Sequence, residues 1–439
     1  MRLGGRMLLA ACGLLPATLP APADAPPRAD RPRVDRDRIE TRILKLSEFG
    51  RNPDGGVSRV AFSEADVAGR AYIAGLMRRA GLAVRIDPAG NIIGRREGLD
   101  PDLPVIMFGS HIDSVPHGGN YDGDVGVVAA IECVEVLQEH SIVTRHPLEV
   151  VVFSDEEGGL VGSRALIGDL SQEALDVVSH SGKTIRQGIR DIGGDADRLA
   201  AAAYHEGEIE AFIELHIEQG AVLADEGIQI GVVEGIVGIN WWEVTIEGFA
   251  NHAGTTPMNK RRDAMLGAAR LTLAVNRIVT ETPGRQVGTV GRIRAEPGAP
   301  NVIPGKVVMS LELRDLSAGK IDLLFNRIRE EAGRIAEQTG TKVRFTPIDV
   351  TAVPALTDER MRRIIVGSAE ALGLSYKLMP SGAGHDAQDL ARIAPIGMIF
   401  VPSVGGISHS PEEFTRPEDM ANGANVLLRS ILGIDQGGH

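Results

Sequence analysis

Cysteine is scarce in this sequence: the 439 residues include only two, Cys12 and Cys133. Cys12 lies in an N-terminal segment that we expect to be a removable leader. The one cysteine that would remain can form neither a disulfide framework nor a thiolate zinc site. Any bound metal is therefore expected to have nitrogen and oxygen ligands.

Basic residues are also outnumbered: the sequence has 46 Lys and Arg against 59 Asp and Glu, which gives a net charge of −13. No basic stripe is present to neutralise phosphates, which argues against a nucleic-acid partner. Beyond the N-terminal segment, no apolar run is long enough to cross a bilayer. The apolar and charged fractions, 43% and 24%, are those of an ordinary globular protein, and the length suits two or three domains.

The N-terminal segment, residues 1–27, has the layout of a secretory signal. Arg2 and Arg6 flank the start of a short apolar core at 7–15, and small residues follow at about 21–25. Residues 9–12 also resemble a lipoprotein box. A genuine leader predicts a periplasmic or secreted protein. An overextended start codon would instead leave a cytoplasmic one.

Four apolar runs end in side chains that bind metals. The run at 105–108 leads to His111 and, past a glycine-rich turn, to Asp122. The other three runs lead to Glu156-Glu157, to His216 and to His409. Short apolar runs bounded by glycine and proline are typical of buried strands. Ligands bind at the carboxyl ends of the strands in open α/β sheets, so one polynuclear metal site is predicted there.

The order of elements predicts an α/β fold with a mostly parallel sheet. Helices are expected at 38–49, 64–80, 125–140 and 358–372, and strands at 84–86, 105–108, 149–153 and 396–401. After residue 220 the pattern changes to strands at 241–246, 287–293, 307–313 and 342–345 with helices at 262–279 and 321–339. This βαββαβ order is the ferredoxin-like arrangement. We therefore predict a discontinuous metal-binding catalytic domain, 36–222 and 350–439, with a ferredoxin-like domain, 223–349, inserted in it.

The five expected ligands mix imidazole and carboxylate, which favours zinc, manganese, cobalt or nickel. They are His111, Asp122, Glu157, His216 and His409. A carboxylate can bridge two metals roughly 3.5–4 Å apart, so Asp122 is the expected bridge and the other four residues divide two per metal. Water between two such ions has its pKa lowered from ~15.7 towards ~7.

Glu156 and Glu157 are adjacent, so in an extended chain they point in opposite directions. One can bind metal while the other faces the water. We assign Glu157 to the metal and Glu156 to the general base, which later protonates the leaving nitrogen. The opposite assignment is also chemically possible from the sequence alone. His117 and His385 lie in glycine-containing turns, and their surroundings assign them no role.

Eight ordered segments resemble the N-carbamoyl-L-amino-acid hydrolase and allantoate amidohydrolase subfamily of the aminoacylase and carboxypeptidase-G-like dinuclear metallohydrolases. The segments are GSHIDSVPHGGNYDGDVGV, FSDEEGG, ELHIEQG, GFANHAGTTPM, PNVIPG, LELRD, SGAGHDA and FVPSVGGISHSPEE. The resemblance implies two divalent metal ions per subunit on the same five ligands, with Glu156 as the base. It also implies a homodimer joined through the inserted domain, which acts as a lid.

The resemblance further implies a set of substrate-binding residues. Arg314 would bind a substrate carboxylate as a bidentate fork. Gln219, Asn301 and Gly384 would bind the carboxylate or the ureido group. His252 would reach the partner subunit's active site and stabilise the oxyanion.

The expected activity is that of a hydrolase of non-peptide carbon–nitrogen bonds in linear amides or amidines. Its expected substrate is a small carbamoyl or ureido acid, first an N-carbamoyl-L-amino acid that yields the amino acid, carbon dioxide and ammonia. Allantoate is the alternative substrate, followed by β-ureidopropionate or a dipeptide. A binding or scaffold protein on a hydrolase fold is the non-enzymatic alternative. One departure from the family pattern is a shorter loop, in which Gly158-Gly159-Leu160-Val161 leads directly into Gly162-Ser163-Arg164.

Overall fold

The computed structural model describes Met1 and residues 32–437, of which residues 33–437 belong to one compact unit. The expected leader, residues 1–27, lies outside the described residues apart from Met1. None of the helices in the described part of the chain is both long enough and apolar enough to cross a membrane.

A nine-stranded sheet forms the larger part of the fold, and its middle strands β4, β3, β5 and β16 run parallel. The strand order is β1-β2-β4-β3-β5-β16-β6-β14, with β15 also paired to β6. The bounds are β1 Ala83–Ile86, β2 Ile92–Arg96, β3 Val105–His111, β4 Leu148–Phe153, β5 Ile209–Ile217, β6 Ile230–Ile236, β14 Ala355–Leu356, β15 Tyr376–Ser381 and β16 Ile396–Val401. The expected strands are present, and the α/β class with a parallel centre is confirmed.

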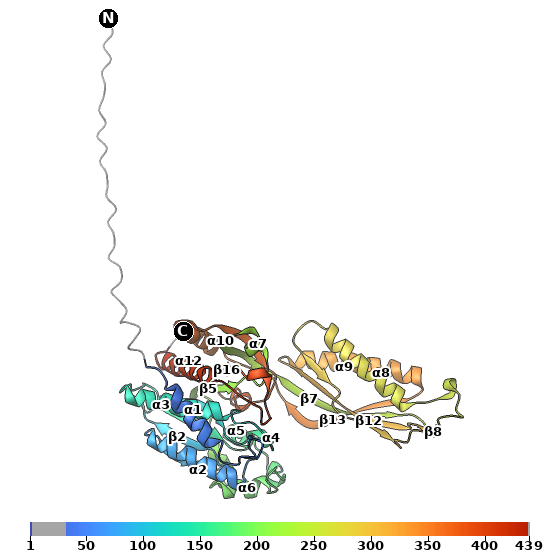
Figure 1. The fold of residues 1–439 in the computed structure, drawn as a ribbon, viewed down its shortest axis with the longest axis horizontal. Coiled ribbons are helices and arrows are strands. Elements are labelled where there is room, and N and C mark those ends of the chain that lie inside the picture. Colours follow the sequence, from blue (N-terminus) through green and yellow to red (C-terminus); the bar gives the residue numbers. More distant parts are fainter. Residues whose placement is uncertain (2–31, 438–439) are drawn as a thin grey trace. The chain divides into compact units, whose positions relative to one another are not determined.

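Both faces of this sheet are covered, which explains the continuous apolar runs. Alternate residues of β3 enter two different cores: Ile106 and Phe108 pack on one face, Val105 and Met107 on the other. The helices α1 Arg36–Leu46, α3 Asp124–Glu139, α10 Glu359–Leu372 and α12 Pro417–Asp435 pack together on the first face (Figure 1). Helix α2 Glu64–Arg79 packs on β1 and β2.

Three of the helices around the large sheet start at residues whose side chains accept hydrogen bonds from free backbone N–H groups. Asp35, Ser63 and Asp358 cap α1, α2 and α10 through their side chains. Helix α12 was not expected, although Pro417 at its first turn with Glu418 and Asp419 is a typical helix start. The remaining short helices are α4 Glu156–Gly159, α5 Val161–Leu166, α6 Ile185–Asp191, α7 Val222–Glu226, α11 Asp386–Leu390, η2 Ala174–Asp176, η3 Leu199–Ala202, η4 Met258–Lys260 and η5 Val404–Gly406.

A second, antiparallel sheet has the order β10-β12-β7-β13, with β9 also paired to β12. Its elements are β7 Gly238–Glu247, α8 Ala264–Glu281, β9 Val287–Thr289, β10 Ile293–Glu296, β12 Lys306–Asp315, α9 Ala318–Thr339 and β13 Lys342–Ala352. Helices α8 and α9 lie side by side along this sheet (Figure 1). The strand expected at 287–293 is two strands, because β9 and β10 pair with different parts of β12.

Two observations set the limits of the second sheet relative to the segment 223–349 that was expected to be inserted. Strand β6, which falls within 223–349, pairs with β16 and β15 and so belongs to the nine-stranded sheet. Strand β13 runs on to Ala352. The second sheet therefore spans 238–352, because a strand follows its hydrogen-bonding partners rather than its place in the chain. A separate two-stranded sheet pairs β8 Asn251–His252 with β11 Val302–Ile303.

Arg59 joins the N-terminal helices to the end of β3. Its side chain is 1% exposed and donates to the backbone oxygens of Leu46, Phe49 and Ile112. It also pairs with the equally buried Asp124 at the start of α3.

We predict that Arg59→Met lowers the free energy of unfolding by about 3–5 kcal/mol, because it leaves a buried carboxylate without its partner. The midpoint of urea denaturation measures this loss. Lys45→Met is the matched control, since Lys45 and its partner Glu48 are about half exposed and such a pair contributes about 0–1 kcal/mol. Equal midpoint shifts in the two variants would contradict the structural role of Arg59.

Candidate metal centre

Parallel pairing brings the predicted ligands to one end of the large sheet. His111 is the last residue of β3 and lies beside Phe153, the last residue of β4. His216 lies near the end of β5, beside Phe400 of β16. Glu156 and Glu157 follow the end of β4 by three and four residues. The sheet thus collects side chains that are far apart in the sequence.

The imidazoles of His111 and His216 are buried, and Nδ1 of each lies near a backbone oxygen. Nδ1 of His111 lies 3.0 Å from the backbone oxygen of Asp113, and Nδ1 of His216 lies 2.9 Å from that of Ile217. Since a carbonyl oxygen only accepts, Nδ1 carries the proton in each ring. Nε2 of each ring is therefore the atom directed at the cluster, and its lone pair is the one that can bind a metal.

Asp122 lies between two groups of possible ligands. Its Oδ1 is 3.0 Å from Nε2 of His216 and 3.7 Å from Nε2 of His111. Its Oδ2 is 3.2 Å from Nε2 of His409, which is itself 3.4 Å from Oε1 of Glu157. The five predicted ligands thus form two groups that share Asp122: one with His111 and His216, the other with Glu157 and His409.

Gly123 makes the approach of Asp122 to His111 possible. It has a φ of 68° and precedes the first residue of α3. A Cβ at this position would lie 2.5 Å from Nε2 of His111. The glycine therefore serves both the left-handed backbone and the close contact.

Glu156 lies beside this cluster, with Oε2 3.7 Å from Nε2 of His111. The pKa of Glu156 is raised well above its usual range. Burial is the larger cause, and the negative charge of the neighbouring Glu157 is the second. A carboxyl group with a raised pKa can hold and release a proton near neutral pH.

The charges of the cluster are poorly balanced. Burial raises the pKa of Glu157 to about 8, and Asp122 adds to that shift. Burial lowers the pKa of His111 to about 4. For Asp122, burial acts upward but is outweighed by His216 and the other imidazoles, which hold its pKa well below the usual range. Crowded carboxylates of this kind need a compensating positive charge.

These residues fit a divalent cation. The buried Nε2 of His111 has no hydrogen-bond partner among the described residues and is aimed into the cluster. The donors are nitrogen and oxygen, and the only cysteine in the described residues, Cys133, is buried in the hydrophobic core. That donor set suits zinc, manganese, cobalt or nickel.

Two carboxylates that we did not predict hold the cluster in place. Asp113 accepts hydrogen bonds from the backbone N–H groups of Glu156 and Glu157, at 3.3 and 3.1 Å. Glu413 accepts from the backbone N–H groups of Asp122 and His409, at 3.0 and 3.3 Å. Each lies two to four residues beyond a predicted ligand, and that proximity was the signal available in the sequence.

A third group, Glu214, His216 and His385, adjoins the first. The ring of His385 is 1% exposed, and its centroid lies 4.5 Å from that of His216. Both oxygens of Glu214 are already bonded, to Ser110 Oγ at 2.7 Å and to the backbone N–H of Ala387 at 3.1 Å. This group therefore supports β5 and its surroundings, whereas His117 is exposed.

Gln219 is the one expected substrate-binding residue that contacts the cluster directly. Its Nε2 donates to Oδ2 of Asp122 at 2.6 Å. Arg314, on β12, donates to the backbone oxygen of Gly382 at 2.7 Å, two residues before Gly384. The structure thus places Arg314 at the loop between β15 and α11.

His252 and Asn301 lie at the two-stranded sheet of β8 and β11. Nδ1 of His252 accepts from the backbone N–H groups of Gly254 and Thr255, so its proton is on Nε2. The backbone oxygen of Asn301 accepts from Ala253 at 3.0 Å. Among the described residues, no hydrogen bond or ion pair joins His252 or Asn301 to the Asp122 cluster.

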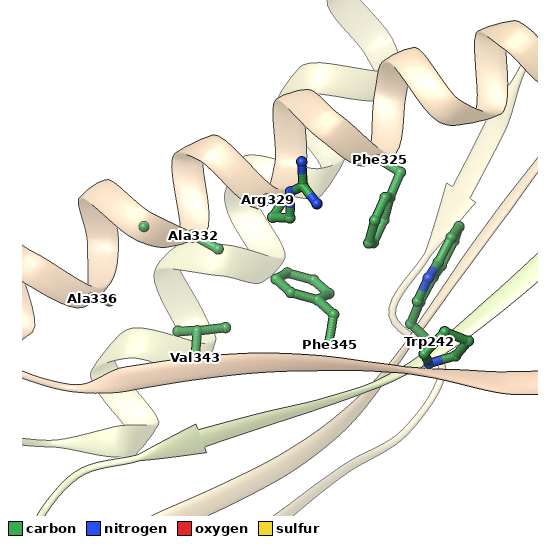
Figure 2. Close-up of a pocket in the computed structure, with 9 residues that line it drawn as sticks. Trp242, Phe325, Arg329, Ala332, Ala336, Val343 and Phe345 are labelled. Atoms are coloured by element: carbon green, nitrogen blue, oxygen red, sulfur yellow. The ribbon is translucent and has the colours of Figure 1, made fainter.

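A cavity of about 420 Å³ lies between helix α9 and strands β7 and β13 of the second sheet. Figure 2 shows Trp242, Phe325, Arg329 and Phe345 among its lining residues. Trp242 and Phe325 stack with ring centroids 4.2 Å apart. None of the predicted site residues lines this cavity.

Known proteins resemble the chain over nearly its whole length. The model of peptidase family M20/M25/M40 matches residues 107–433. An N-carbamoyl-L-amino acid amidohydrolase of Geobacillus stearothermophilus is 42% identical, over 92% of this chain and 100% of its own length. A ureidoglycolate hydrolase of Arabidopsis thaliana is 40% identical, over 91% and 86%. An allantoate amidohydrolase of Bacillus subtilis is 34% identical, over 89% and 96%.

Solved structures agree with these sequence comparisons. A hydantoinase/carbamoylase family amidase from Burkholderia multivorans superposes with a TM-score of 0.86 at 36% identity, covering 92% of this chain and 98% of its own. The resemblance inferred from the motifs is confirmed, and the chain belongs to peptidase family M20/M25/M40, among the N-carbamoyl-L-amino-acid and allantoate amidohydrolases.

Proposed function

We propose that this protein is a metal-dependent amidohydrolase that cleaves the ureido C–N bond of an N-carbamoyl-L-amino acid. One substrate molecule and one water give the amino acid, carbon dioxide and ammonia. The observation that carries the reaction class is the Asp122 cluster, with a buried carboxyl, Glu156, beside it. The substrate class is supported by relatives of that name, which match over 92% of this chain.

Two divalent cations are proposed, one held by His111, Asp122 and His216 and the other by Asp122, Glu157 and His409. When bound, such ions polarise a carbonyl and lower the pKa of water towards ~7. Asp113 and Glu413 keep the ligand loops in position through backbone hydrogen bonds.

Glu156 is the proposed general base. Its carboxylate takes the proton from the attacking water and later delivers it to the leaving nitrogen. Its environment supports this role, because burial raises the pKa of Glu156 and so favours the protonated carboxyl that exists between the two steps.

Arg314 is the proposed partner of the substrate carboxylate, with Gln219, Asn301 and Gly384 binding the carboxylate or the ureido group. His252 is the proposed donor to the oxyanion from the partner subunit. Its support is the tautomer: with Nδ1 accepting two backbone N–H groups, Nε2–H is left as a donor.

The inserted segment is proposed to be a ferredoxin-like lid that also joins the homodimer. We place it at 238–352, from β7 to β13, and the discontinuous catalytic domain on either side of it. The strand order β10-β12-β7-β13 with two helices on one face supports this proposal.

Ammonia release from a panel of substrates tests the proposed activity. The panel contains N-carbamoyl-L-amino acids, their D enantiomers, allantoate, ureidoglycolate and β-ureidopropionate, with dipeptide cleavage followed separately. We expect the highest kcat/KM with an N-carbamoyl-L-amino acid. A higher value with allantoate or ureidoglycolate would reassign the substrate, and inactivity on the whole panel in the metal-loaded protein would favour a scaffold.

We predict that Glu156→Gln retains its metal and loses about 10²–10⁴-fold in kcat, the usual contribution of general acid–base catalysis. Metal content and turnover are measured on the same preparation. Glu157→Gln is the matched control, because the loss of a ligand should lower metal content as well. Normal turnover in Glu156→Gln would overturn its role as the base.

Exhaustive dialysis against a chelator should abolish activity, and Mn²⁺, Co²⁺ or Zn²⁺ should restore it, because the cluster offers only nitrogen and oxygen donors. Elemental analysis of the dialysed protein is the necessary control. Full activity in protein shown to contain no metal would refute the metal mechanism.

A further inference from the structure

Arg314 already has a carboxylate partner within its own strand. Its Nε lies 2.9 Å from Oε1 of Glu312, and its Nη2 lies 3.1 Å from Oε2. These two parallel bonds form a bidentate pair, the geometry with which arginine binds carboxylates most specifically. About a quarter of each side chain is exposed, so the pair is accessible from solvent.

The sheet register places Trp241 against this pair. Trp241 is directly opposite Glu312 in the antiparallel pairing of β7 and β12. Its indole Nε1–H donates to Oε2 of Glu312 at 2.6 Å. Glu312 therefore accepts from both neighbours and is fixed between them.

This group lies on the face of the second sheet opposite its helices. Leu311 and Leu313 of β12 enter the core shared with α8 and α9, whereas Glu312 and Arg314 alternate with them and are only half-buried. The remaining contact of Arg314, from Nη1 to Gly382, joins this face to the loop that carries Gly384.

The Arg314 guanidinium has N–H groups left over for a ligand. A guanidinium has five N–H groups, and the bonds to Glu312 and Gly382 use three of them. Two remain, one on each terminal nitrogen. Arg314 can thus bind a second carboxylate without releasing Glu312.

We propose that Glu312, held by Trp241, is a positioning residue that orients Arg314 towards the substrate carboxylate and cancels its charge. This inference rests on the proposed function, because it takes Arg314 to be the carboxylate-binding residue. A neutral Glu312–Arg314 pair selects a carboxylate by the direction of two N–H groups rather than by net charge. The pair thereby favours a carboxylate placed at one angle over any other anion.

The test compares the best carbamoyl or ureido substrate of the panel with its carboxamide in the full-length, metal-loaded protein. In Glu312→Gln the amide –NH₂ faces an N–H donor of Arg314 or of Trp241, so the fork is lost. We expect the ratio of kcat/KM for the carboxylate to that for the carboxamide to fall about tenfold or more, the usual effect of a hydrogen bond to a charged group. The KM for the carboxylate should also become more sensitive to salt, because Arg314 is left with a net charge.

Two further variants separate orientation from charge. Glu312→Asp keeps the charge but is too short to reach both nitrogens, so the ratio should fall while the salt dependence stays that of the wild type. Trp241→Phe removes the N–H donor while keeping an aromatic ring, and a smaller fall in the ratio is expected. Thermal unfolding and metal content of each variant are measured in parallel.

Each outcome decides a different point. General structural damage lowers kcat/KM for both substrates equally, and an unchanged ratio in Glu312→Gln overturns the positioning role. If the wild type does not distinguish the carboxylate from the carboxamide, or if Arg314→Ala still does, the role of Arg314 in the proposed function fails and this proposal fails with it. If the wild type distinguishes the two substrates, Arg314→Ala does not, and Glu312→Gln distinguishes them as well as the wild type does, this proposal alone is overturned.

Discussion

The parallel hydrogen bonding of β4, β3, β5 and β16 is the constraint on which the rest of the structure depends. It aligns the carboxyl ends of these strands, so that His111, Glu157 and His216 arrive at one edge from positions spread over about a hundred residues. An antiparallel neighbour would send its carboxyl end to the opposite edge. The helices on both faces serve this arrangement, because a sheet with parallel strands needs apolar cover on each side.

A second layer of hydrogen bonds converts that edge into a defined cluster. The loops after β3 and β4 are joined by Asp113, and those around Asp122 and His409 by Glu413. In each case a buried carboxylate accepts backbone N–H groups, which fixes the chain on which a ligand is carried and leaves the ligand's own side chain free. Deleting such a carboxylate would act on the ligands through the backbone.

Much of the fold could be predicted from the sequence, because its strongest signals are local. Apolar runs, caps and ligand-type residues at strand ends indicated the large sheet and brought the five residues of the Asp122 cluster to attention. What was missed depends on tertiary contacts. Strand β6 lies within 223–349, the segment predicted to be inserted, and only its pairing with β16 assigns it to the large sheet. The break between β9 and β10 depends on how each meets β12.

The supporting residues were missed for the same reason. Proximity to His409 was the one sequence signal for Glu413, and a glycine-containing turn the one for His385; their roles became clear only from their contacts with Asp122 and His216. For Arg314, the sequence identified the residue but not its partners. The motif marked the arginine, but its pairing with Glu312 and the cross-strand hydrogen bond from Trp241 follow from the register of β7 and β12.

The unequal burial of the two ligand groups has a consequence for how the protein would be loaded. The side chains of His111 and His216 are 0% and 1% exposed, whereas that of His409 is 47% exposed. A cation on the His409 side of Asp122 would be open to water and to competing chelators, and one between His111 and His216 would be shielded from them. Exchange would then proceed in a fixed order, through a singly occupied form. A protein loaded with one metal and then exposed to a second metal would exchange only the cation on the His409 side. The product would be a mixed-metal protein that retains the first metal between His111 and His216.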